Sequence, residues 1–133
     1  MKILLTNDDG IHAPGIVALH AALEGLGEVT TVAPATVQSA AGHGITFHQP
    51  LMCRHVRVNS TMEGWAVEGR PADCTKVALR SLWAELHGEG TRPDVTISGM
   101  NVGANVGINV IYSGTVAAAV ESAFLGVPAI AVS

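Results

Sequence analysis

Two adjacent carboxylates, Asp8 and Asp9, stand just after the apolar stretch 3–5 (ILL) at the start of the chain. Neighbouring like charges repel each other, and a carboxylate beside an apolar core loses its hydration. A shared divalent cation would offset both costs. Adjacent residues of an ideal strand point to opposite faces, so we expect the strand to end here, with Gly10 allowing the bend that brings both side chains together.

Two further loops carry oxygen-bearing side chains. Residues 35–44 (ATVQSAAGHG) include Ser39, and residues 99–113 (GMNVGANVGINVIYS) include Asn101 and Asn105. Carboxylate, hydroxyl and amide oxygens are the ligands that Mg²⁺ and Mn²⁺ prefer, whereas zinc prefers His and Cys, which have no ligand spacing in these loops. The residue types therefore favour a hard cation.

A helix start follows the third loop. Ser113 and Thr115 precede an Ala-rich segment, and a helix N-terminus offers free N–H groups and a positive dipole end that suit a phosphate. A cation beside a phosphate site is the usual equipment of phosphoryl-transfer chemistry, because the cation polarises a phosphoryl oxygen and lowers the pKa of a bound water.

Each feature also has a purely structural interpretation. Asp-Asp-Gly commonly forms a turn, Ser39 can be an ordinary loop serine, and Ser113 can be a plain helix cap. The spacing of Gly99, Gly103 and Gly107 could reflect close helix packing. The interleaved asparagines argue against packing, since Asn favours turns and left-handed backbone. Taken together, the features favour a site for metal and phosphate.

The elements that must position these residues alternate between strand and helix. Apolar runs and turn residues predict helices from Pro14 to before Gly25, from a cap at Asp73 to before Gly88, and over 115–125. Strands are predicted at 2–7, 28–33, 45–48, 51–58, 65–68, 94–98 and 128–133, with a hairpin turn at 59–64.

This order predicts a three-layer α/β fold, with a mostly parallel sheet and an inserted β-hairpin. In such sheets ligands bind beyond the carboxyl ends of the strands, where the three polar loops begin. Residues 128–132 (PAIAV) show no polar alternation, so we expect that strand to be buried on both faces.

The composition limits the function classes. The 133 residues fit one domain, 1–133, and charged residues make up 14% of it, against about 25% in an average domain. The shortage of charge suggests a covered surface, such as a subunit interface. The net charge of −4 and the absence of a basic run argue against a nucleic-acid polymer as partner.

Cys53 and Cys74 lack zinc spacing and are interpreted as reduced thiols of a cytoplasmic protein. Neither a signal peptide nor a membrane span is expected.

Five segments together resemble the survival protein E (SurE) family, whose members are metal-dependent phosphatases of nucleoside monophosphates. They run in the family's order over nearly the whole chain. The segments are ILLTNDDGIHAPGI, VQSAAGHGITFHQPL, WAVEGRPADC, PDVTISGMNVGANV and YSGTVAAAVESAFLGVPAIAVS.

The resemblance implies a Rossmann-like fold and a 5'-nucleotidase that hydrolyses nucleoside 5'-monophosphates, and also 3'-monophosphates. It implies one divalent metal ion per subunit, Mg²⁺ or Mn²⁺, and a dimer or tetramer of the full-length form. The implied metal ligands are Asp8, Asp9, Ser39 and Asn101, the implied phosphate site is Asn105, Ser113, Gly114 and Thr115, and the implied catalytic residues are Asp8, Asp9, Asn105, Ser113 and Thr115.

Three departures from the family pattern stand out. Arg70 occupies a position where the family usually has Thr, and Ala40 follows Ser39 where Gly is more usual. The family also typically continues well beyond residue 133, so a C-terminal part of the fold is expected to be missing here.

Two other classes of protein compete with this interpretation. A dinucleotide-binding oxidoreductase would carry GxGxxG after the first strand, where NDDGIHAPG stands instead. A non-catalytic nucleotide-binding protein, or a truncated structural copy of the fold, remains the main alternative. The DxD spacing of aspartyl-nucleophile phosphatases is also absent, which favours direct attack by water.

Overall fold

A six-stranded sheet forms the centre of the protein, whose computed structural model describes residues 1–133. The strand order is β3-β4-β2-β1-β5-β6, and only the β3–β4 pair is antiparallel. The predicted mostly parallel sheet with an inserted hairpin is therefore confirmed. The strands are β1 (Lys2–Thr6), β2 (Glu28–Pro34), β3 (Cys53–Arg57), β4 (Glu63–Val67), β5 (Val95–Ser98) and β6 (Ala129–Ala131).

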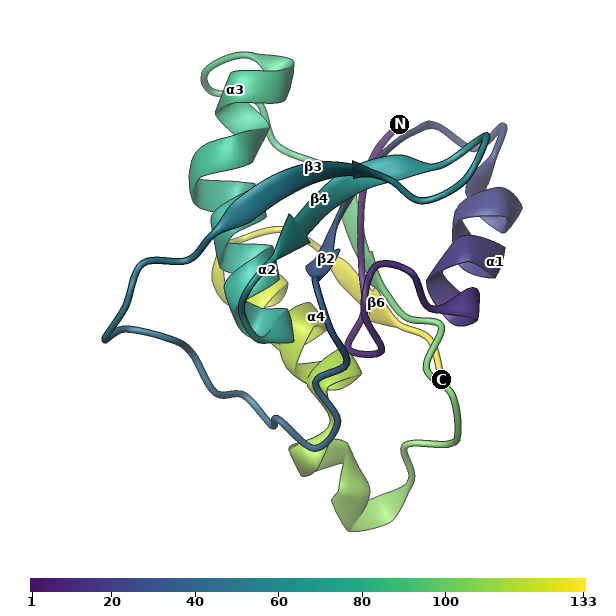
Figure 1. The fold of residues 1–133 in the computed structure, drawn as a ribbon, viewed down its shortest axis with the longest axis vertical. Helices are drawn as coiled ribbons and strands as arrows, with labels where there is room; N and C mark the ends of the chain where they lie inside the picture. Colours follow the sequence, from purple (N-terminus) through teal and green to yellow (C-terminus); the bar gives the residue numbers. More distant parts are fainter.

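Helices cover both faces of this sheet, which gives the three predicted layers (Figure 1). Helix α1 (Pro14–Leu23) lies on one face. On the other face, α2 (Pro71–Val77) continues through a π-helical turn, η1 (Ala78–Leu82), into α3 (Trp83–His87), and α4 (Gly114–Phe124) lies beside α2. The longest helix, α4, has 11 residues, and none of the helices combines the length and apolarity needed to cross a bilayer.

Two apolar clusters lie on the two faces of the sheet. Ile3 and Leu5 of β1 pack with Ile16 of α1, while Leu4 packs with Trp83 on the opposite face. Successive strand residues point to opposite faces, so a strand with helices on both sides must be apolar throughout. This explains the unbroken apolar run that precedes the two aspartates.

The predicted strand at 45–48 does not form, and Asp73, which was predicted to cap its helix, is not the N-cap. Thr46 donates from its backbone N and its Oγ1 to the Asp73 carboxylate, both at 2.8 Å. Asp73 is the third residue of α2, and it also accepts the N–H of the actual N-cap, Arg70, at 2.9 Å. The Thr46 amide is thus bound to a carboxylate instead of a neighbouring strand.

Some boundaries and burial predictions were also wrong. The hairpin turn closes early, so that β4 begins at Glu63, because Asn59 Oδ1 accepts the N–H groups of Thr61 and Met62. The 99–113 loop contains a 3₁₀ helix, η2 (Gly107–Tyr112). Ile130 of β6 is 54% exposed, because β6 lies at the edge of the sheet and pairs only with β5.

Candidate active site

The polar loops meet at the carboxyl ends of the central strands. The chain passes from β1 to β2 on one side of β1 and later returns to β5 on its other side. Loops 7–13 and 99–106 therefore leave the sheet from neighbouring strands in diverging directions. Such a switch point is where open α/β sheets bind ligands.

A tight turn brings the two aspartates to the same side. Asn7, fully buried after β1, donates from Nδ2 to the carbonyl oxygen of Gly10 at 2.8 Å. Gly10 has φ +99°, and an added Cβ would lie 3.3 Å from the carbonyl carbon of Thr36. Glycine suits this backbone best, and the turn directs Asp8 and Asp9 into one cavity.

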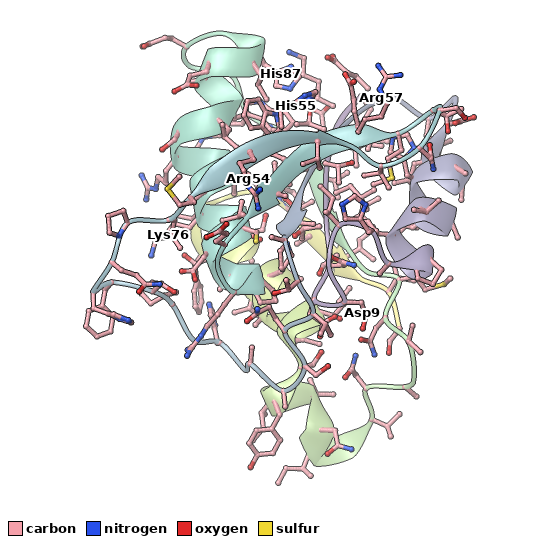
Figure 2. The ribbon with its side chains drawn as sticks, in the orientation of Figure 1. Asp9, Arg54, His55, Arg57, Lys76 and His87 are labelled. Carbon is pink, nitrogen blue, oxygen red and sulfur yellow. The ribbon has the colours of Figure 1, made fainter.

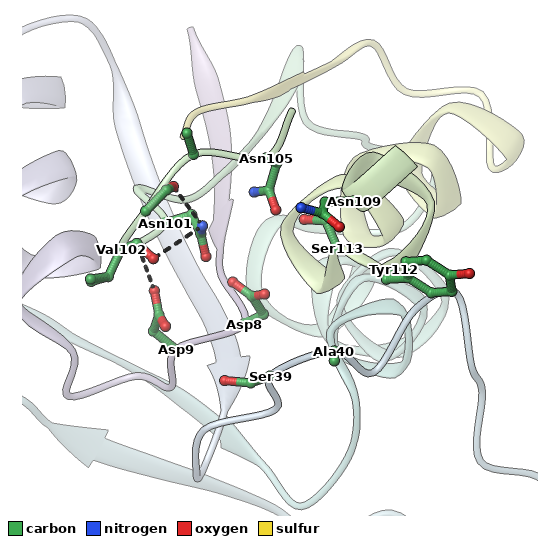
Figure 3. A pocket seen from close by; sticks show the side chains of 12 residues that line it. Asp8, Asp9, Ser39, Ala40, Asn101, Val102, Asn105, Asn109, Tyr112 and Ser113 are labelled. Carbon is green, nitrogen blue, oxygen red and sulfur yellow. Dashed lines mark hydrogen bonds between the residues drawn. The ribbon is translucent and has the colours of Figure 1, made fainter. Parts of the chain in front are cut away.

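This cavity has a volume of about 330 Å³, and its walls are mostly polar (Figure 3). No lysine, arginine or histidine lines it. In Figure 2 the labelled His55, Arg57 and His87 lie at the other end of the sheet from Asp9. The lining residues are Asp8, Asp9, Ser39, Ala40, Asn101, Val102, Gly103, Ala104, Asn105, Asn109, Tyr112 and Ser113.

Asp8 is held by the N-terminus of α4. Thr115 Oγ1 donates to Asp8 Oδ1 at 2.6 Å, and Asp8 is only 6% exposed. Burial raises the pKa of the Asp8 carboxyl, Thr115 lowers it through hydrogen bonds from its hydroxyl and backbone, and the charge of Asp9 raises it, with a net upward shift. Thr115 is itself fully buried and does not line the cavity, and its hydroxyl is bound to Asp8.

Gly114 allows this close approach of helix and aspartate. An added Cβ would lie 2.7 Å from Asp8 Cβ and 2.9 Å from Pro71 Cγ. Ser113 caps α4 by accepting the N–H of Val116 at 3.2 Å, and it also lines the cavity. Of the three predicted phosphate-site residues at this helix end, only Ser113 faces the cavity.

Asp9 and Asn101 are linked through the loop after β5. The backbone N–H of Val102 donates to Asp9 Oδ2 at 3.1 Å. Asn101 Nδ2 donates to the carbonyl oxygen of Gly103 at 2.8 Å, so its amide oxygen points toward Asp8 (Figure 3). Ser39 completes the group, on a loop joined to the turn after β1 by the bond from Gln38 N to the carbonyl oxygen of Asp8 at 2.8 Å.

The side chains of Asp8, Asp9, Ser39 and Asn101 fit a hard divalent cation. Two carboxylates, one hydroxyl and one amide oxygen converge on one space, and no basic side chain neutralises the carboxylates. No group of three or more His, Cys, Asp or Glu that could hold a metal occurs anywhere in residues 1–133. The donor set therefore has the chemistry of Mg²⁺ or Mn²⁺ ligation.

Two polar side chains line the cavity in addition to those of the predicted site residues. Asn109 continues the four-residue spacing of Asn101 and Asn105, which was the available signal, whereas Tyr112 is placed only by the turn of η2. Asn105 is fixed by Ser133, whose Oγ accepts from Asn105 N at 2.9 Å and from Asn105 Nδ2 at 3.1 Å.

The fold and the cavity define an α/β protein with an oxygen-lined cavity at the switch point of a mostly parallel sheet. The family model described as Survival protein SurE matches residues 3–133, and the chain belongs to this family.

Similar proteins match this chain over all or nearly all of its length. It is 54% identical over 134 residues to a 5'-nucleotidase SurE of Rhodopirellula baltica, with 100% of this chain and 51% of the relative covered. A 5'-nucleotidase SurE of Heliobacterium modesticaldum is 53% identical, with 47% of its length covered. The crystal structure of the SurE protein from Aquifex aeolicus is 41% identical, with a TM-score of 0.83, and the match covers 98% of this chain and 50% of that one. The chain thus spans about half the length of these relatives.

Proposed function

We propose that the protein hydrolyses phosphate monoesters in a divalent-metal-dependent reaction, with nucleoside 5'-monophosphates, and also 3'-monophosphates, as substrates. The observation that carries this proposal is the cavity at the switch point, where Asp8 and Asp9 share one space with neutral oxygen donors and without a basic side chain. The relatives named 5'-nucleotidase SurE support the substrate class.

Asp8, Asp9, Ser39 and Asn101 would hold one Mg²⁺ or Mn²⁺ ion. When bound, the ion supplies Lewis-acid polarisation of the phosphoryl group and a water of lowered pKa. Thr115 holds Asp8 in place through the bond from its hydroxyl, and this bond lowers the pKa of the carboxyl against the rise that burial causes. The N–H of Val102 donates to Asp9 Oδ2 and holds that carboxylate in place.

The rest of the cavity would hold the substrate. The amides of Asn105 and Asn109 and the hydroxyl of Ser113 can donate to phosphate oxygens. Tyr112 lies at the outer rim (Figure 3), where its ring offers a surface for a base. In the reaction a water oxygen bonds to phosphorus, the ester P–O bond breaks, and the nucleoside oxygen leaves with a proton, yielding nucleoside and phosphate.

Hydrolysis of a chromogenic phosphate ester and of nucleoside monophosphates tests this proposal. We expect turnover with Mn²⁺ or Mg²⁺, none after EDTA, and recovery when the metal is restored. Nucleotide binding by calorimetry without phosphate release would instead identify a non-catalytic binding protein.

The proposed partners follow from the same site and surface. They are small nucleotides and further copies of the chain. We propose that the protein is cytoplasmic and binds neither nucleic-acid polymers nor membranes. The exposed edge strand β6, with Ile130 on its surface, supports self-association.

A further inference from the structure

A buried carboxylate outside the cavity links three parts of the fold. Glu121, in the third turn of α4, is 7% exposed. Its Oε2 accepts from His43 Nε2 at 2.8 Å, and its Oε1 lies 3.5 Å from Lys76 Nζ of α2. The His43 ring also stacks on Phe124, with ring centroids 5.8 Å apart and an angle of 15° between the planes. None of these residues lines the cavity.

His43 belongs to the loop that carries Ser39. This loop runs from the end of β2 at Pro34 to the start of β3 at Cys53 without a helix or strand. From Gln38 to Thr46, four contacts join the loop to other parts of the chain through hydrogen bonds. They are the bond of Gln38 N to the carbonyl oxygen of Asp8 at 2.8 Å, that of Gly42 N to the carbonyl oxygen of Tyr112 at 3.1 Å, that of His43 to Glu121, and those of Thr46 to Asp73. The place of Ser39 therefore depends on a few contacts.

Glu121 lies on the same helix that holds Asp8. Thr115, which precedes Glu121 by less than two turns of α4, donates to Asp8 at 2.6 Å. One rigid helix thus contacts Asp8 at its start and, through His43, the Ser39 loop further along. A helix fixes the distance between two such contacts far better than a loop does.

We infer that His43 and Glu121 are positioning residues that hold Ser39 opposite Asp8. Lys76 approaches the second carboxylate oxygen and offsets the cost of burying the charge. Glu121 is the buried partner of this group, whereas the side chains of His43 and Lys76 are 32% and 45% exposed. The inference rests on the proposed function, in which Ser39 and Asp8 are ligands of one metal ion.

Mn²⁺ binding by calorimetry tests this inference without relying on turnover. We expect His43→Ala to weaken Mn²⁺ binding by about tenfold, the low end of effects from residues that orient metal ligands. His43→Gln should recover part of the affinity, because its amide can still donate to Glu121. His48→Ala is the matched control, because His48 is an exposed histidine of the same loop without a carboxylate partner, and it should bind Mn²⁺ normally.

A double-mutant cycle with Ser39→Ala separates positioning from general damage. If His43 acts through Ser39, His43→Ala should change Mn²⁺ affinity less than twofold once the Ser39 hydroxyl is gone. A second tenfold loss in that background would overturn the inference, and so would normal binding by the single His43→Ala variant. Should His43→Ala fail to fold, as judged by melting in EDTA, Glu121→Gln takes its place in the same cycle with the same expected outcomes.

The cycle also distinguishes this inference from the proposed function. If Ser39→Ala alone binds Mn²⁺ normally, Ser39 is not a ligand, and the proposed metal site fails together with the inference. If Ser39→Ala weakens binding and His43→Ala does not, only the positioning role of His43 is refuted.

Discussion

Alanine in place of Gly114 is expected to damage the site far more than the fold. Gly114 is the first residue of α4, and its missing side chain leaves room for Asp8. An added Cβ would lie 2.7 Å from Asp8 Cβ and 3.0 Å from Asp8 Oδ2. To restore an ordinary contact of 3.4 Å, Asp8 must retreat by about 0.7 Å, or α4 must move away from β1.

The effects on stability and on activity differ in size. Crowding a packed site costs about 1–3 kcal/mol, while alanine gains about 0.5–1 kcal/mol over glycine in a helix. We therefore expect the free energy of unfolding to fall by at most about 2.5 kcal/mol. A displacement close to 1 Å can cost about 100-fold in catalysis, and we expect a loss of that order in kcat/KM, together with weaker Mn²⁺ binding.

The assay pairs hydrolysis of a chromogenic phosphate ester with Mn²⁺ calorimetry and thermal melting. Val116→Ala is the control, because this half-buried residue of the same helical turn does not line the cavity. It should lose some stability but keep its affinity for Mn²⁺. If Gly114→Ala keeps kcat/KM within about threefold of the parent, the position of Asp8 against α4 does not matter for the chemistry and the reasoning is wrong.

Four further predictions concern the carboxylates and the sheet edge. Asp9→Asn should lower Mn²⁺ affinity and activity by orders of magnitude, and should raise the melting temperature in EDTA because its repulsion of Asp8 is gone; normal Mn²⁺ calorimetry would contradict a shared cation. Thr115→Val removes the 2.6 Å bond to Asp8, so Mn²⁺ binding should weaken most at low pH, as seen by calorimetry at pH 6 and pH 8. The pKa of Asp8 is raised in the folded chain, so the folded chain binds this proton more tightly than the unfolded chain does. In EDTA the melting temperature should therefore rise as the pH falls from neutral toward the usual Asp pKa of 3.8. Added Mn²⁺ should abolish this pH dependence. Ile130→Lys places a charge on the exposed edge strand β6 and should reduce self-association measured by light scattering; unchanged association would exclude this edge as the contact.

The first βαβ unit was predictable because its signals are local. Residues 3–5 form an apolar run, Pro14 begins α1, and the glycines at 25 and 27 follow its end. Two predictions failed because they depended on distant residues. The segment 45–48 is bound by Asp73 through hydrogen bonds that span 27 positions, and the burial of Ile130 depends on what lies beside β6.

The cavity was predictable in outline and less so in detail. The carboxyl ends of β1, β2 and β5 meet at one edge, so loops rich in Asp, Ser and Asn had to gather there. Sequence alone could not tell what the N-terminus of α4 would contact. Its distance from β1 decides that Thr115 meets Asp8, and only a residue without a side chain at position 114 permits that distance.

The adjacent carboxylates are compensated by hydrogen-bond donors and not by basic side chains. Asp8 receives the Thr115 hydroxyl at the positive end of α4, and Asp9 receives the N–H of Val102. These neutral donors reduce the repulsion but leave the charge in place. A phosphate dianion that enters the cavity alone therefore meets two carboxylates whose charge no basic side chain offsets, whereas the same dianion is attracted once a divalent cation is present. Nucleotide affinity should accordingly depend on prior metal binding, and this coupling follows from the lack of any lysine or arginine among the residues that line the cavity.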